Sequence, residues 1–357
     1  MNQRCVLLVG TSKGAFILES ADDRRSWQLR GPLCDGWPIH DISVERGTNA
    51  LLAGAGSPWF GPAVFRSEDL GATWTHSSEG LTYGDGGPKV TKVWNVTAGL
   101  DGIYAGVDPA GLFRSTDRGA TWQHVEGLTS HPSRSEWGPG AGGLILHTIV
   151  PHPTDAARMW VGISSVGVFE TRDGGTTWQT RNRGTRAEFN PENRYPEYGQ
   201  CVHKLVLADG EQRLYQQNHC GVYRSTDGGE RWEEITGGLP NDFGFVIASH
   251  PRDPMTAWTI PLTDPEEGRL MPEGKAAVWR TNDGGDTWLR GWEGLPQENA
   301  FVGVLREAMA VDRLDPVGVY FGTSTGQLYG SADEGVTWTR VAENLPPIWS
   351  VETLVLE

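Results

Sequence analysis

Cysteine is scarce in this chain, with four residues among 357, and no two of them form a CxxC pair. A disulfide-stabilised scaffold and a zinc ribbon are therefore not expected. No apolar run approaches the roughly 18 residues of a membrane helix, and the apolar stretch near the N-terminus is too short for a signal peptide. We therefore expect a cytoplasmic protein that has no membrane partner.

Basic residues are also in deficit, because 30 Lys and Arg face 45 Asp and Glu, for a formal net charge of −15. Such a chain repels phosphate backbones, so a nucleic-acid partner is not expected. Glycine, in contrast, occurs 48 times, nearly twice its usual share of roughly 7%, and tryptophan occurs 16 times. Many tight turns combined with large apolar anchors are typical of an all-β repeat protein.

An eight-residue pattern, Ser/Thr-x-Asp-x-Gly-x-Thr-Trp, recurs along the chain roughly every 50 residues. In each copy the Asp carboxylate can accept backbone N–H groups, the Gly can take a positive φ, and the Trp can bury a large area. We therefore expect the Asp to be structural rather than a catalytic acid. The seven copies, of which the first is degenerate, cover residues 20–27, 67–74, 115–122, 171–178, 225–232, 281–288 and 331–338.

This pattern resembles the Asp box of the BNR-repeat, sialidase-like β-propellers, and the resemblance spans nearly the whole chain. It implies an all-β protein, a seven-bladed β-propeller with four-stranded antiparallel blades, in one domain over residues 1–357. The second period predicts strands over 40–45, 50–55, 63–67 and 73–77. The first period lacks an innermost strand, which we expect residues 349–356 to supply, closing the ring without exposed sheet edges. A self-closed ring of this kind can be monomeric.

The resemblance is much less informative about activity. The same box occurs in sialidases, xyloglucan-degrading enzymes, sortilin-type receptors and photosystem assembly factors. Family sialidases use six blades and an Arg-Ile-Pro motif, whereas the nearest string here is Arg30-Gly31-Pro32. None of the eight Tyr can be paired by position with a Glu to form their nucleophile. Sialidase activity is therefore not expected.

The positions at which the innermost strands begin are unusually polar. Counting back two residues from an apolar pair in each strand gives one position per blade, and residues two apart share a strand face. We expect these seven side chains to surround the mouth of the central channel. In blade order they are Glu352, His40, Lys92, His147, His203, Phe245 and Glu307, with Arg306 competing for the last position.

Imidazole and carboxylate groups at equivalent positions predict a divalent transition metal, Zn, Mn, Fe, Co or Ni. A metal-activated water would then hydrolyse a small ester, lactone or phosphoester. Lys92, Glu307 and Glu352 are the expected catalytic residues, with Lys92 stabilising negative charge. A solvated channel whose polar groups only bond one another is the alternative. The predicted metal ligands are His40, His147, His203, Glu307 and Glu352.

Long connections at 127–146 and 181–200 lead directly into this ring, and such connections are usually functional. Their aromatic residues could line a pocket for a small-molecule substrate, or could simply plug the top of the ring. The residues expected to bind substrate are Trp59, Phe60, Trp137, Tyr195, His219 and Phe245.

Cys201 and Cys220 lie symmetrically about the turn at 209–212, so we expect them to face each other near the mouth. Free thiols, a disulfide and a thiolate ligand to the metal all stay open. Because Cys201 and His203 are two apart, a hydrolase using a Cys–His pair is also possible. A glycoside hydrolase, a glycan-binding protein and a non-enzymatic propeller scaffold are the remaining alternatives.

Overall fold

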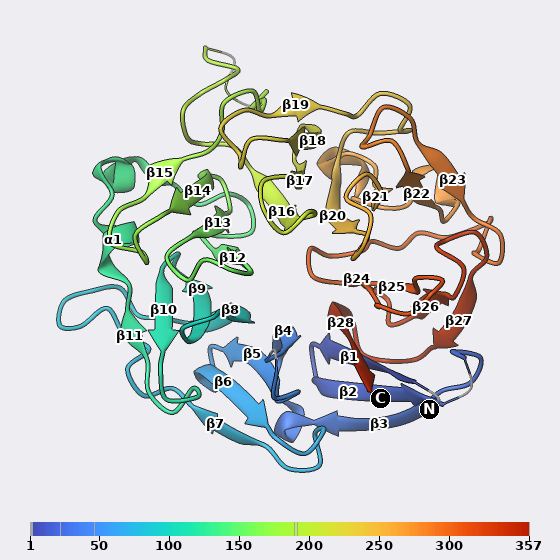
Figure 1. Ribbon diagram of the computed structural model, residues 1–357, viewed down its shortest axis with the longest axis horizontal. Helices are drawn as coiled ribbons and strands as arrows, with labels where there is room; N and C mark the ends of the chain where they lie inside the picture. Colours follow the sequence, from blue (N-terminus) through green and yellow to red (C-terminus); the bar gives the residue numbers. More distant parts are fainter. Residues whose placement is uncertain (1–2, 22, 46, 189, 191, 357) are drawn as a thin grey trace.

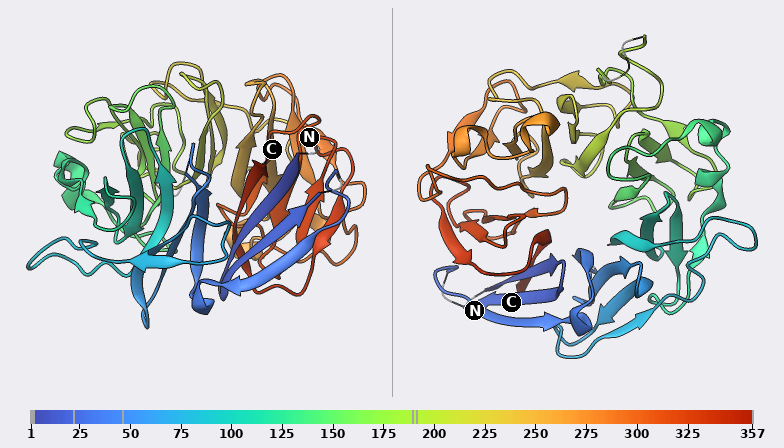
Figure 2. Two further views of the ribbon diagram at one scale, coloured as in Figure 1. Left: turned by 60° about the horizontal axis from the view of Figure 1, so that its bottom comes forward. Right: turned by 180° about the vertical axis from the view of Figure 1, so that it is seen from behind.

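The computed structural model describes residues 3–21, 23–45, 47–188, 190 and 192–356. It contains seven four-stranded antiparallel sheets, arranged as blades around a central axis (Figure 1). The predicted seven-bladed β-propeller is thereby confirmed. Figure 2 shows the same ring from behind and from an oblique direction. Among the described residues, no helix has the length and apolar character needed to cross a membrane.

Each blade runs from an innermost strand at the axis to an outermost strand at the rim. From the inside outward, the first blade contains β28 (Ile348–Leu356), β1 (Arg4–Thr11), β2 (Gly14–Ser20) and β3 (Gln28–Leu33), and the second contains β4 (Ile39–Val44), β5 (Leu51–Ser57), β6 (Gly61–Ser67) and β7 (Thr75–Ser77). The third blade contains β8 (Lys92–Ala98), β9 (Ile103–Asp108), β10 (Leu112–Ser115) and β11 (Gln123–His124). The fourth contains β12 (Leu146–Pro151), β13 (Met159–Ile163), β14 (Gly167–Thr171) and β15 (Gln179–Thr180).

The remaining blades follow the same order. Their strands are β16 (Val202–Leu207), β17 (Leu214–Asn218), β18 (Gly221–Ser225) and β19 (Glu233–Glu234); β20 (Gly244–Ser249), β21 (Ala257–Pro261), β22 (Val278–Thr281) and β23 (Leu289–Gly291); β24 (Met309–Val311), β25 (Val319–Gly322), β26 (Leu328–Ser331) and β27 (Thr339–Ala342). The short helices in the connections are α1 (Glu126–Thr129), η1 (Cys34–Gly36), η2 (Pro132–Glu136), η3 (Pro265–Glu267) and η4 (Pro272–Gly274).

The C-terminal strand closes the ring as expected. β28 pairs antiparallel with β1, from Arg4 opposite Leu356 to Thr11 opposite Ile348. In Figure 1 the red β28 lies beside the blue β1, so the two ends of the chain belong to one blade. The first blade therefore has all four strands, and β28 is its innermost strand.

The apolar core lies between neighbouring blades. Alternate residues of β1 pack on opposite sides, because Leu7 and Val9 belong to the cluster shared with the seventh blade, while Val6 and Leu8 belong to the cluster of the second. A strand buried on both faces needs an almost continuous apolar sequence, as β1 has. Each blade thus depends on both of its neighbours.

The repeated turn connects the two outer strands of a blade, and its Asp accepts hydrogen bonds from other residues of the same turn. In the third blade, Asp117 accepts the backbone N–H of Thr121 at 2.9 Å, the Thr121 hydroxyl at 2.7 Å and the Ser115 hydroxyl at 2.7 Å. The Ser115 Oγ also accepts the N–H of Gly119, whose φ is 85°. The aspartate of the first copy, Asp22, lies outside the described residues.

We expect acid to weaken the fold through these turns. Hydrogen bonds from Thr73 and Thr121 lower the pKa of Asp69 and of Asp117 to about 2, below the unfolded value of about 3.9. Such carboxyls stabilise the fold above the unfolded pKa, and this contribution is lost as the pH falls through the folded pKa. Stability should therefore drop between about pH 4 and pH 2. Urea denaturation at several pH values measures the slope, which should be shallower in the Asp69→Asn, Asp117→Asn double variant; an unchanged slope contradicts the assignment.

Candidate functional site at the channel mouth

β-Bulges shape the end of the channel at which the innermost strands begin. In the first six blades the pairing of the innermost strand shifts by one residue near its start, so two residues oppose one on the partner strand. In the seventh blade a parallel bridge pairs Glu307 with Ser350, which places Arg306 level with the bulge residues. We call these seven residues the mouth ring: Trp349, His40, Trp94, His147, His203, Phe245 and Arg306.

The mouth ring corrects the predicted alignment in three blades. His40, His147, His203 and Phe245 occupy the expected places. Trp349 replaces Glu352, Trp94 replaces Lys92, and Arg306 replaces Glu307. The bulges do not explain these errors, because the four correctly aligned blades also contain one. The apolar pairs from which the count started were displaced, by two residues in the third blade, one in the seventh and three in the first, because strands buried on both faces offer several such pairs.

His40 is held by stacking rather than directed at the axis. Its ring lies between those of Trp94 and Trp349, with centroid distances of 4.9 and 4.7 Å. Its Nε2 lies 3.0 Å from the Gly56 carbonyl oxygen and must donate to it, since a carbonyl only accepts. Burial lowers the pKa of His40 to about 4, so the ring is neutral. It joins three neighbouring blades.

His147 has both ring nitrogens engaged. Nε2 donates to the Val202 carbonyl at 3.0 Å, and Nδ1 accepts from the Thr148 hydroxyl at 2.9 Å. Neither nitrogen keeps a free lone pair for a metal. The expected convergence of His40, His147 and His203 on one point is therefore not found among the described residues, which corrects the predicted ligand set.

The predicted carboxylates and Lys92 also lie apart from a shared metal point. Lys92 pairs with Asp108 at 3.3 Å and lies 4.9 Å from the Trp94 ring centroid. Glu352 accepts the N–H of Thr353 at 2.7 Å. Glu352 joins no group of metal-ligating atoms within the described chain.

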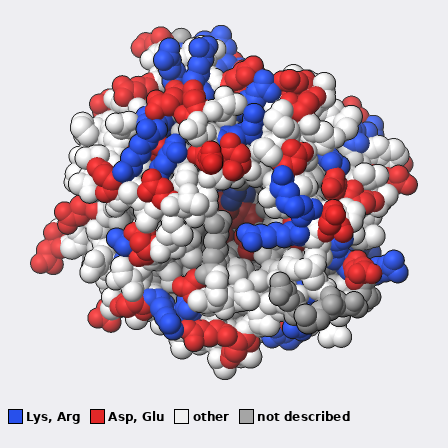
Figure 3. Space-filling view, in the orientation of Figure 1, with Lys and Arg blue, Asp and Glu red and all other residues white. Residues whose placement is uncertain are grey.

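Glu307 belongs to a charged group further along the channel, formed with Lys204, Asp41 and Glu352, which we call the channel cluster. Lys204 forms an ion pair with Glu307. Asp41 accepts from Asn95 at 2.8 Å, but burial, and then Glu307, raises the pKa of Asp41 to about 8. Acidic and basic side chains are visible in the hollow at the centre of the ring (Figure 3).

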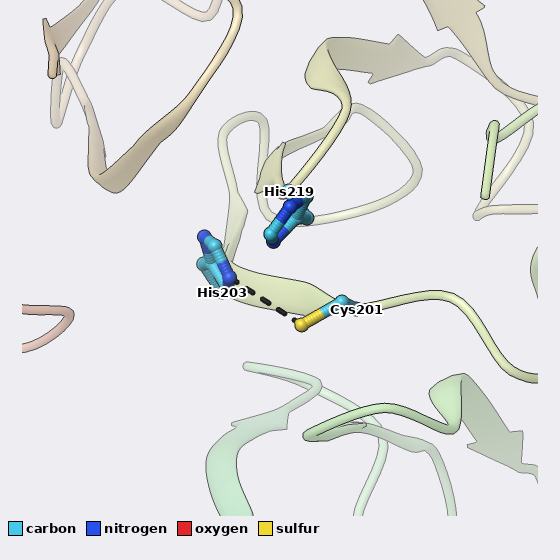
Figure 4. A group of neighbouring side chains, drawn as sticks. All are labelled: Cys201, His203 and His219. Carbon is cyan, nitrogen blue, oxygen red and sulfur yellow. Dashed lines mark hydrogen bonds between the residues drawn. The ribbon is translucent and has the colours of Figure 1, made fainter. Parts of the chain in front are cut away.

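Three side chains at the mouth do come together: Cys201, His203 and His219 (Figure 4). Their potential ligand atoms all lie within 4.8 Å of one another. Cys201 precedes β16 and His219 follows β17, and the His219 N–H donates to the Cys201 carbonyl at 2.9 Å. The ladder between the two strands therefore fixes the group. Each of the four cysteines is a free thiol, Cys201 being half-buried and Cys220 buried.

The tautomer of His203 directs a lone pair at the thiol. Nδ1 lies 2.6 Å from the Gly244 carbonyl oxygen, so it carries the proton and donates it. Burial, and then Arg306, lowers the pKa of His203 well below its ordinary value, so the ring is neutral. Nε2 is therefore unprotonated, 3.5 Å from the Cys201 Sγ. A backbone carbonyl in this position is a common partner of metal-ligating histidines.

The spacing suits a tetrahedral metal. Zinc bonds of about 2.3 Å to sulfur and about 2.0–2.1 Å to nitrogen imply an S···N edge of roughly 3.6 Å, against 3.5 Å between Cys201 and His203. His219 supplies a third donor, which leaves one position of a tetrahedron for water or substrate. Thiolate and imidazole donors together favour zinc or cobalt over calcium and magnesium.

The predicted substrate-binding residues separate into three groups. His219 and Phe245 lie at the site, and the Phe245 ring is 4.7 Å from that of His203. Trp137 is buried instead, 5.2 Å from Phe169, so it plugs the fourth blade. The others are exposed on connections of the second and fourth blades, without a described contact to the site: Trp59, Phe60 and Tyr195.

Comparison with known proteins supports the fold. No protein-family model and no curated protein matches the sequence. Similar solved structures include a GH74 xyloglucanase from Xanthomonas campestris (19% identity, TM-score 0.66, 94% of this chain and 52% of that one). Others are YCF48 from Cyanidioschyzon merolae (14%, 0.53, 86% and 86%) and a protein from Bacteroides uniformis provisionally named a 6-phosphogluconolactonase (10%, 0.57, 99% and 100%).

At these identities the likeness establishes the fold alone. The chain spans about half the length of the xyloglucanase. Fold and mouth geometry together define a seven-bladed β-propeller with a Cys–His–His group at one end of its channel.

Proposed function

We propose that this propeller is a metal-dependent hydrolase of a small ester, lactone or phosphoester. Its divalent transition metal, zinc or cobalt by preference, would be held by Cys201, His203 and His219. The observation that carries the proposal is the unprotonated Nε2 of His203, fixed by Gly244 and 3.5 Å from the Cys201 Sγ. We also propose that the seven repeats are related to the Asp-box repeats of the BNR, sialidase-like propellers.

When bound, such a metal polarises a carbonyl or phosphoryl oxygen and lowers the pKa of water. The chain contributes the surroundings. The Gly244 carbonyl keeps His203 in the tautomer whose Nε2 lone pair can bind a metal. In the channel cluster, Glu307 has a buried carboxylate oxygen, Oε1, without a hydrogen-bond partner among the described residues. The names of two structural neighbours, a xyloglucanase and a lactonase, support the hydrolase class.

Cobalt titration tests the metal. Full-length protein should develop a thiolate-to-cobalt absorption band, and zinc should displace it. Cys201→Ser should remove the band, and His219→Ala should weaken metal affinity at least tenfold, the smaller of the losses seen when metal-site partners are removed. Cys34→Ala is the matched control, because Cys34 is a free, buried thiol in the connection between β3 and β4. A wild-type protein that shows no band refutes the metal.

Hydrolysis of nitrophenyl esters, phosphoesters and lactones should in turn be lost with a chelator and restored by zinc. The same geometry would serve a thiol nucleophile with His203 as its base. Turnover that survives both the chelator and His219→Ala, but not iodoacetamide, would identify that chemistry instead.

A glycoside hydrolase is the second candidate. Its support is the contrast in the channel cluster, where burial keeps Asp41 protonated near neutrality while Glu307 is paired with Lys204. Environments that hold one carboxyl protonated beside an ionised one are typical of acid–base pairs. Chelator-insensitive sugar release that is lost in Glu307→Gln would favour this candidate, and inertness in every assay would favour a scaffold.

A further inference from the structure

Two arginines at the mouth form no ion pair with any residue that the structure describes. Most described arginines of this acidic chain pair with a carboxylate, as Arg186 does with Glu234 at 2.7 Å. Arg306 of the mouth ring and Arg269, in the connection between β21 and β22, form no ion pair and no side-chain hydrogen bond among the described residues. The Nε of Arg306 is buried and has no hydrogen-bond partner within the described part of the chain. An unsatisfied buried donor is costly, so it points to a group that completes it.

Both guanidinium groups lie over one aromatic pair. Arg306 is 5.0 Å from the Phe245 ring centroid, and Arg269 is 5.8 Å from Phe243 and 5.9 Å from Phe245. The two rings are themselves 5.2 Å apart, edge to face. This aromatic pair holds two like charges near each other, and their repulsion contributes to lowering the pKa of Arg306, after burial.

The pair adjoins the Cys–His–His group. Phe245 is 4.7 Å from the His203 ring and Phe243 is 5.1 Å from the His219 ring. A Cys201 thiolate favours the charged form of Arg306. Glu307 is the acidic side chain that interacts electrostatically with Arg306, and it already forms an ion pair with Lys204. Three further acidic residues interact electrostatically with His219: Asp242, Asp264 and Glu266. Asp242 is 3.4 Å from Arg186.

From this arrangement we infer that the substrate carries a phosphate group, bound by Arg306 and Arg269 beside Cys201, His203 and His219. The inference rests on the proposed function, because it sets the phosphate next to the bond that the site would cleave. Two guanidinium groups match the charge of a phosphate monoester, which is about −2 near neutral pH, and the guanidinium fork suits its oxygens. A carboxylate has a single negative charge and would neutralise only one of the two guanidinium groups.

Calorimetric titration of the full-length, metal-free protein with inorganic phosphate tests the subsite. Phosphate should bind, and Arg306→Gln should weaken binding about tenfold to a hundredfold, as for the loss of a charge-assisted hydrogen bond. Arg306→Lys should not restore it, since lysine lacks the fork. Arg269→Gln, at an exposed position, should weaken binding without affecting folding. Arg290→Gln is the matched control, because Arg290 lies 5.8 Å over Trp292 away from the mouth.

Equal phosphate affinity in wild type, Arg306→Gln and Arg269→Gln would overturn the subsite, as would tighter binding of acetate than of phosphate. The cobalt titration distinguishes the two proposals. Metal binding without arginine-dependent phosphate binding leaves the hydrolase proposal and refutes the subsite. Arginine-dependent phosphate binding without metal binding supports the subsite and refutes the metal.

Discussion

Replacing Asp312 with alanine is expected to destabilise the propeller by about 3–5 kcal/mol, the usual cost of breaking a buried ion pair. The side chains of Asp312 and Arg24 are 0% and 9% exposed, and their ion pair is 3.1 Å long. Asp312 lies in the seventh blade and Arg24 in the first, so the pair spans the junction at which the ring closes.

The carboxylate of Asp312 is saturated with donors. Oδ2 also accepts from the Tyr320 hydroxyl at 2.8 Å and from the Cys5 thiol at 3.8 Å, while Oδ1 accepts the N–H of Gly318 at 2.8 Å. Burial raises the pKa of Cys5 to about 12, so the thiol stays protonated and donates. Alanine would remove the acceptor of the Gly318 N–H and of the Tyr320 hydroxyl and would leave the Cys5 thiol only its 3.5 Å contact with that hydroxyl.

Urea denaturation followed by tryptophan fluorescence measures this loss. The control is Glu273→Ala, which removes an ion pair to Lys275 from a side chain that is 74% exposed and should cost no more than about 1 kcal/mol. An Asp312→Ala variant as stable as the control would show that ring closure does not depend on this group.

The fold could be predicted because the signal is repeated. Seven copies of one turn set the number of blades, and the apolar segment at 349–356 identified the closing strand, which the structure places at β28. The four strands predicted for the second blade agree with β4 to β7 within two residues at each end. Local chemistry sufficed here, since the turn needs its Asp, Gly and Trp wherever it occurs.

The site could be predicted only in part, because bulges are invisible to a count with period two. Cys201 and Cys220 are symmetric about the turn at 209–212, but the bulge at His203 shifts the register by one. The residue opposite Cys201 is therefore His219, and a thiol–imidazole pair replaces the expected pair of thiols. The same shift hid Asp41 and Lys204, each of which directly follows a ring histidine.

Replacing Lys204 with methionine is the second large effect that we expect. It should cost about 3–5 kcal/mol at pH 8, because it leaves Glu307 charged and unpaired in the channel. The side chains of Lys204 and Glu307 are 18% and 7% exposed. Although burial acts to lower it, the pKa of Lys204 is raised overall by Glu307 and then by Asp41 and Glu352, so one ammonium serves three carboxyl groups.

The loss should be smaller at pH 5. Burial raises the pKa of Asp41 to about 8 and also raises that of Glu352, so the folded chain binds more protons than the unfolded chain between about pH 4 and pH 8. Stability from these groups is then present at low pH and falls as the pH rises. Removing the ammonium strengthens the mutual repulsion of the carboxylates, which should steepen this decline.

A double-mutant cycle with Glu307→Gln isolates the pair, measured by urea denaturation at pH 5 and pH 8. The Lys204→Met, Glu307→Gln variant should recover most of the stability lost in Lys204→Met at pH 8, because the direct partner of Lys204 no longer carries a charge and only Glu352 still repels Asp41. Asp41→Asn, which keeps an oxygen for the 2.8 Å bond from Asn95, should flatten the decline in the otherwise wild-type chain. Equal losses at both pH values, or no recovery in the double variant, would mean that water reaches the channel freely enough to solvate Glu307 alone.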